Sequence, residues 1–173
     1  MRPLAPLAFA AAVLAPAAIV QAAETWSVQS FPAERFSIEA PVKLERQPVQ
    51  QIEGAGAMQS FVGVEGQVVY IVTATDISAA PEVGGATPDQ IVDLVMAGSL
   101  EGSTLVSQRP ATHPGGVARD FTMRTGEGDL MRNRIVYQHP WVYSNLVATK
   151  GSDPAVLDGA SANRFLGSLK ASR

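Results

Sequence analysis

The sequence predicts an α+β fold in which one antiparallel β-sheet of about six to seven strands is covered by two main helices. Short segments that alternate apolar and polar residues dominate the chain. A helix with a clear N-terminal signal separates two groups of these segments, and a second helical pattern comes last. The order strands, helix, strands, helix is typical of an antiparallel sheet with helices packed on it.

The first group contains three predicted strands. Phe36 to Ala40 alternates strictly and stops at Pro41, as expected of a strand with one buried face. Residues 67–75 carry the β-branched and aromatic run of a central strand, and residues 57–64 are its predicted partner. The segment from Gly63 to Gly66 would turn the chain between them, which makes a hairpin.

The first helix is predicted to start at Thr87. Thr87 suits the N-cap, Pro88 the first helical position, Asp89 the first turn and Gln90 the third position of a capping box. Gly98 or Gly102 would mark its end. The expected apolar face consists of Ile91, Leu94, Val95 and Met96.

A second hairpin is predicted around the loop Gly126-Glu127-Gly128, between strands at residues 116–125 and 129–138. Only one register separates apolar from charged residues, and it places Asp120 opposite Arg134. One face then carries Phe121, Met123, Met131, Ile135 and Tyr137. The other carries Asp120, Thr122, Arg124, Arg132 and Arg134.

After a turn at residues 138–141, a last strand is predicted from Val142 to Thr149 with the same parity. Val142 and Leu146 join the buried set, while Trp141, Tyr143 and Asn145 share the face of the two arginines. A C-terminal helix is predicted from Asp153-Pro154. Its apolar spacing is given by Leu157, Ser161, Phe165 and Leu169.

Residues 1–22 have the pattern of a secretory signal peptide. Arg2 gives a positive start, an uncharged apolar run extends from Leu4 to Val20, and Val20-Gln21-Ala22 supplies a small-residue cleavage site. The alternative is a membrane anchor, but the run is short of the ~20 residues that a spanning helix needs and contains prolines. We therefore expect cleavage near Ala23.

The mature chain, residues 23–173, is expected to form a single globular domain that is exported and soluble, in the periplasm or outside the cell. Apolar residues make up 46% of the sequence and charged residues 17%, which is unlike a disordered chain. The formal net charge of −3 gives no reason to expect a nucleic-acid partner. Cysteine is absent, which excludes disulfides, thiol chemistry and lipid attachment at cysteine, so no stable membrane insertion is expected after signal cleavage.

Three segments resemble small exported bacterial proteins of the PsbP-like fold. Residues 36–41 are similar to their F-x-V-x-x-P opening, residues 134–137 with 142–143 to a characteristic strand pair, and residues 162–169 to their A-x-x-F-L-x-S-F ending. The resemblance implies a PsbP-like fold. It implies no catalytic residues, because this fold serves as an extrinsic photosystem subunit, as a Ran-binding import factor and as many periplasmic proteins of unknown role.

No familiar catalytic or metal-binding pattern is found in the sequence. His113 and His139 each precede a proline, which is typical of turns, and the serine at Ser99 lacks the spacing of a nucleophile elbow. Asp89 and Asp93 share a helix face and suit the helix N-terminus and solvent better than acid–base catalysis. We therefore expect no catalytic residues, no cofactor and no metal.

One constellation is a candidate ligand or partner patch: Arg132, Arg134, Trp141 and Tyr143 on one sheet face. Guanidinium groups beside aromatic rings bind anionic or aromatic ligands and anchor protein partners. The alternative is structural: the second helix covers this face, Arg134 pairs with Asp120 and the arginine stems pack on Trp141. The sequence leaves both open.

These observations favour a non-catalytic periplasmic accessory or binding protein with an unassigned ligand or protein partner. A small periplasmic hydrolase with an unrecognised site and a structural envelope protein are the alternatives. A buried polar cluster with perturbed pKa values would favour the hydrolase, and a large exposed apolar patch would favour the structural protein.

Overall fold

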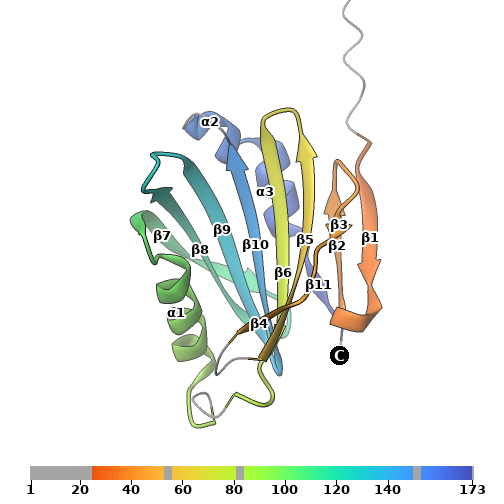
Figure 1. Ribbon diagram of the computed structural model, residues 1–173, viewed down its shortest axis with the longest axis vertical. Helices are drawn as coiled ribbons and strands as arrows, with labels where there is room; N and C mark the ends of the chain where they lie inside the picture. The colour runs from red at the N-terminus through yellow and green to blue at the C-terminus, as the bar shows by residue number, and fades with distance from the viewer. Residues whose placement is uncertain (1–24, 53–55, 81–83, 150–152, 173) are drawn as a thin grey trace, which may run out of the picture.

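The computed structural model describes residues 25–52, 56–80, 84–149 and 153–172, and these form two antiparallel sheets and three α-helices (Figure 1). The signal peptide expected at residues 1–22 lies outside them. The large sheet has the order β3-β5-β6-β10-β9-β8-β7, with β4 also paired to β5. Its strands are β3 (Glu45–Arg46), β4 (Gln50–Ile52), β5 (Gly56–Glu65), β6 (Val68–Asp76), β7 (Ser103–His113), β8 (Gly116–Thr125), β9 (Leu130–Gln138) and β10 (Trp141–Thr149).

A small second sheet lies beside the large one and has the order β1-β2-β11. It consists of β1 (Ser27–Phe31), β2 (Phe36–Ala40) and β11 (Lys170–Ala171), and the 3₁₀ turn η1 (Pro32–Glu34) joins the first two. The helices are α1 (Pro88–Ser99), α2 (Pro154–Leu157) and α3 (Ala160–Gly167).

The α+β class is as predicted, but the expectation of one sheet of six to seven strands is wrong, because the described residues contain eleven strands in two sheets. Residues 36–40 form a strand as predicted, with Phe36, Ile38 and Ala40 buried, yet this strand lies in the small sheet. The sequence analysis does not predict β7. This edge strand is exposed along most of its length, so it lacks the apolar alternation by which strands are recognised.

Both predicted hairpins of the large sheet are present, and the second one, β8–β9, has the predicted register. β5 and β6 pair around Gly66, and β8 and β9 pair around the loop Gly126 to Gly128, with Asp120 opposite Arg134. Gly128 has φ +94°, the left-handed conformation that such a loop requires. Since a slip by one residue would exchange the two faces, the charge pattern selected the register correctly.

Both faces of the large sheet pack against other elements, and the two faces form separate cores. The first, called the α1 face, packs Phe121, Ile135 and Val142 against Ile91 and Val92 of α1. The second, called the C-terminal face, packs against α2, α3 and the small sheet. Its core contains Phe36, Phe61, Tyr70, Val136, Tyr143, Val147, Leu157, Phe165 and Leu166.

The capping box of α1 is confirmed. The backbone N–H of Gln90 donates to Thr87 Oγ1 at 3.3 Å, and the N–H of Thr87 donates to Gln90 Oε1 at 2.8 Å. The predicted apolar face is wrong in one respect: Leu94, expected to be buried, is 55% exposed, and Val92, not assigned to this face, is buried. The reason is that α1 packs on β8 and β9, so only a narrow side of the helix is covered.

The predicted C-terminal helix is interrupted. α2 ends at Leu157 and α3 begins at Ala160, so Leu157, Phe165 and Leu169 are buried from three different segments. A Cβ at Gly159 would lie 3.2 Å from the carbonyl oxygens of Ala155 and Val156, so the close turn between the helices suits a residue without a side chain.

No helix among the described residues is both long enough and apolar enough to span a bilayer.

Replacing Thr87 with Ala should destabilise the protein by about 1 kcal/mol, because the Gln90 amide loses its side-chain acceptor. The free energy of unfolding from urea denaturation measures the loss. Thr87→Ser, which keeps the hydroxyl, is the control and should retain most of the stability. Equal losses in both variants would show that the capping bond does not stabilise α1.

Candidate functional site

Three arginines converge on the buried carboxylate of Asp120. Arg134 donates from Nε to Oδ1 at 2.5 Å and from Nη2 to Oδ2 at 3.0 Å. Arg132 Nη2 donates to Oδ2 at 3.2 Å, and Arg109 Nε donates to the same oxygen at 3.4 Å. We call these four residues the Asp120 cluster. In this cluster the carboxylate of Asp120 is paired with three positively charged guanidinium groups.

Strand pairing positions the members of the Asp120 cluster. β8 and β9 pair Asp120 with Arg134, and Arg132 lies two residues away on the same face. β7 contributes Arg109 because a bulge between Leu105 and Ser107 shifts its register. Before the bulge Leu105 pairs with Met123, and after it Arg109 pairs with Asp120, so β7 changes the face on which its odd-numbered side chains lie.

Arg132 joins the sheet to the C-terminal helices. Its side chain is only 3% exposed, and Nη1 donates to the carbonyl oxygen of Leu157 at 3.0 Å and to Asn163 Oδ1 at 2.8 Å. The Leu157 carbonyl ends α2, where the last carbonyls have no partner within the helix and suit a cationic donor. The guanidinium thereby satisfies groups from β8, α2 and α3.

The pKa of Asp120 is lowered in the folded protein. Burial opposes ionisation and by itself would raise this pKa, but hydrogen bonds and charges from Arg134, together with those from Arg132, outweigh it. Asp120 is therefore ionised at neutral pH, as the three arginines require.

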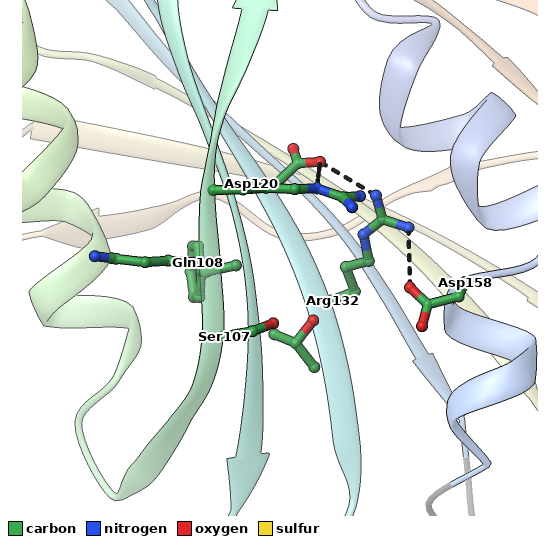
Figure 2. Close-up of a pocket in the computed structure, with 8 residues that line it drawn as sticks. Ser107, Gln108, Asp120, Arg132 and Asp158 are labelled. Atoms are coloured by element: carbon green, nitrogen blue, oxygen red, sulfur yellow. Dashed lines mark hydrogen bonds and ion pairs between the residues drawn. The ribbon is translucent and has the colours of Figure 1, made fainter.

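A pocket of about 200 Å³ opens beside the cluster. Figure 2 shows the Arg132 guanidinium between the carboxylates of Asp120 and Asp158, with Ser107 on the neighbouring strand and Gln108 directed away from them. Asp158 is an exposed rim residue that lies 3.7 Å from Arg132. Lining residues are Ser107, Gln108, Arg109, Asp120, Phe121, Thr122, Arg132 and Asp158.

The predicted patch of Arg132, Arg134, Trp141 and Tyr143 does lie on one face of the sheet, but that face is covered. Arg132 and Tyr143 are buried, whereas Arg134 and Trp141 are half-buried. Tyr143 donates from its hydroxyl to the backbone oxygens of Glu34 and Arg35, and burial raises its pKa. The four side chains do not form an exposed patch, because α2, α3 and the small sheet pack over them. Ligand binding by these four residues stays a prediction.

The two histidines and the two aspartates of α1 do not belong to the Asp120 cluster. His139 Nδ1 lies 3.2 Å from the Tyr137 hydroxyl, within hydrogen-bond distance. The pKa of His113 is lowered by burial and by the charge of Arg134. Asp89 and Asp93 both pair with Arg119 of β8, which fastens α1 to the sheet. Within the described ranges, no three side chains of the metal-binding types come together.

A larger cavity, of about 600 Å³, lies on the α1 face, and we call it the α1 groove. Its surface is mostly apolar and comes from α1 and the strands β4, β5, β6, β8, β9 and β10. Lining residues are Ile52, Met58, Thr73, Thr75, Ile77, Val95, Gly98, Ser99, Glu101, Met123, Asn133, Val142, Ser144 and Leu146.

The α1 groove contains a polar pair in an apolar surface. Asn133 is buried, and its Oδ1 accepts a hydrogen bond of 2.8 Å from Ser144 Oγ. The hydroxyl of Thr73 belongs to the same region, because β6 and β10 pair Thr73 with Ser144. The pair is therefore a fixed polar point among aliphatic side chains.

Sequence reasoning did not find the α1 groove. It placed Leu146 and Met131 in the buried set, but both are only half-buried, because α1 covers β8 and β9 and does not extend over the whole face. The signal was present in the strands: Val62 and Ile71 face the same side as Leu146, and they are half-exposed too. A helix too short to cover all of these residues could have indicated an open face.

No protein family recognised from sequence and no curated protein matches the chain. Among solved structures, the chain is similar to cyanobacterial PsbP (CyanoP) from Synechocystis sp. PCC 6803, with a TM-score of 0.55 and 12% identity over 96% of this chain and 99% of that one. A protein of unknown function from Pseudomonas aeruginosa gives a TM-score of 0.44 and 14% identity over 77% of this chain and 88% of that one. The likeness to CyanoP supports a PsbP-like fold.

Replacing Asp120 with Asn should destabilise the protein by about 3 kcal/mol near neutral pH, because buried arginines lose their counter-charge. Since the pKa of Asp120 is lowered on folding, its ionised form contributes stability above its unfolded pKa of about 4, and this contribution is lost as the pH falls through the folded pKa. The difference from wild type should thus shrink below about pH 4. Urea denaturation from neutral pH to below about pH 4 measures the difference in the free energy of unfolding between the variant and wild type.

The control for this prediction is Glu127→Gln, which removes an exposed carboxylate from the loop after β8. It should change the stability little at any pH. A pH-independent difference between Asp120→Asn and wild type would contradict the role assigned to the ionised carboxylate.

Proposed function

We propose that this chain is an exported, non-catalytic binding protein that holds a small amphipathic molecule in the α1 groove. The observation that carries the proposal is the groove itself: a mostly apolar cavity of about 600 Å³ with a polar pair in its lining. Small-molecule sites in proteins have volumes of roughly 300–1,000 Å³, apolar walls and a few fixed polar groups.

The lining defines the chemistry of the ligand. Met58, Val95 and Leu146 offer aliphatic and thioether surface from three different elements. A ligand with an apolar body would cover half-exposed side chains that α1 leaves in water, and burying them is favourable by about 25 cal/mol per Å². The driving force is therefore hydrophobic.

The polar pair favours one hydrogen-bonding group on that apolar body. Asn133 and Ser144 are joined to each other, and the Ser144 hydroxyl oxygen can still accept a hydrogen bond. Glu101 lies on the lining at the end of α1, so an anionic group there would meet a like charge. We thus infer a neutral or cationic ligand with one donor near Ser144.

N-phenyl-1-naphthylamine is a suitable probe, because it is neutral, largely apolar and carries one N–H donor. Its fluorescence should rise saturably on binding to the purified protein. Thr73→Phe, which places a ring in the groove, should weaken binding by at least about tenfold, equivalent to ~1.4 kcal/mol.

Val69→Phe is the matched control. Val69 lies four residues before Thr73 on β6, faces the same side of the sheet and is half-exposed, but does not line the groove. It should bind the probe like wild type. Equal weakening by both variants, or a fluorescence rise without saturation, would contradict a defined site and indicate a diffuse apolar surface.

Export is the second part of the proposal, and it rests on the leader pattern at residues 1–22. Protein expressed from the full sequence should be recovered from the periplasmic or secreted fraction with Ala23 as its first residue. Intact mass spectrometry measures this. Full-length protein retained in the cytoplasm or membrane fraction would contradict the proposed cleavage and export.

A further inference from the structure

We propose that the pocket at the Asp120 cluster binds a small oxyanion, of the phosphate or carboxylate type, between Arg109 and Arg132. This site is on the C-terminal face of the large sheet, whereas the α1 groove is on the other face. It is therefore independent of the function proposed above.

The charges around the pocket favour an anion. The guanidiniums of Arg109, Arg132 and Arg134 surround the single buried carboxylate of Asp120. Asp158 adds a second carboxylate, but it is exposed on the rim and screened by water. Arg134 does not itself line the pocket, but it pairs with Asp120, and with its charge these five side chains carry one surplus positive charge that a bound anion would balance.

Arg109 is the member of the cluster that is available to a ligand. Its side chain is 58% exposed, and its one contact to Asp120 is a long 3.4 Å bond from Nε. Its terminal nitrogens make no hydrogen bond to the described residues. Arg132, in contrast, is fixed by Asp120, Leu157 and Asn163. An exposed guanidinium with few contacts, beside one that is held in place, can donate to a bound oxyanion.

The bulge in β7 builds the pocket. Because the register shifts after Leu105, Ser107 pairs with Thr122 and Arg109 with Asp120, which brings both side chains of β7 to the charged face. Without the shift they would lie on the opposite face. The hydroxyls of Ser107 and Thr122 then add neutral donors to the pocket lining. Bulges that redirect side chains are common at functional sites.

The size of the pocket limits the ligand. The pocket volume of about 200 Å³ is below the usual range for drug-sized molecules, but it is several times the volume of a water molecule. It is therefore large enough for inorganic phosphate or a short carboxylate. The ligand class is therefore a small oxyanion, and larger anions would have to project past Asp158 into solvent.

Inorganic phosphate and acetate are the two probes, titrated separately into the protein at constant ionic strength. The signal is the Nε–H resonance of Arg109 in the arginine-labelled protein, assigned with Arg109→Lys. Saturable shifts with either probe support the site, and the tighter probe identifies the class. No saturable shift with either would overturn the proposal.

Arg109→Ala should weaken binding of the tighter probe by about 10- to 100-fold, the loss expected for a charge-assisted hydrogen bond, as read from the backbone amide of Ser107. Arg109→Lys should recover part of it. The matched control is Arg124→Ala, which removes another exposed arginine, from β8, outside the pocket. Unchanged affinity in Arg109→Ala, or equal weakening by Arg124→Ala, would also overturn the proposal.

Discussion

The charge of Asp120 is the constraint on which the arrangement of the C-terminal face depends. A carboxylate inside a sheet-helix interface is stable only if its charge is compensated, and here Arg134 and Arg132 compensate it. Arg132 in turn satisfies the last carbonyl of α2 and the side chain of Asn163. One buried anion therefore fixes two arginines, and one of these arginines fixes how the two short C-terminal helices lie on the sheet.

Burial of both sheet faces by different elements gives the molecule two unequal cores. The C-terminal face is closed by α2, α3 and the small sheet, whose aromatic residues Phe31 and Phe36 pack on Phe61 of the large sheet. Among the described residues, the α1 face is covered by one helix, α1, which is held at β8 by Arg119. The remaining strands of that face stay half-exposed, and the α1 groove follows from this incomplete cover.

The same few strands serve both proposed sites. In β8, Asp120 and Thr122 face the oxyanion pocket, while Met123 lines the α1 groove. Alternation of side chains along a strand keeps the two environments apart, one charged and one apolar. The bulge in β7 is the local exception to this alternation, and it adds Arg109 to the charged side. The PsbP-like fold is compatible with such surface sites but specifies no ligand.

The sequence by itself determined the α+β class, the register of the β8–β9 hairpin with Asp120 opposite Arg134, and the start of α1 at Thr87. It could do so because capping residues, turn glycines and the alternation of apolar and charged residues act over short distances. Tertiary structure alone decided that Arg132 and Tyr143 are buried, that the C-terminal helix is broken at Gly159, that β7 joins the edge and that β2 belongs to a second sheet. These outcomes depend on which distant segment covers which face. An arginine on a strand has the same local pattern under water or under a helix, so only packing could distinguish an exposed patch from an interior ion pair.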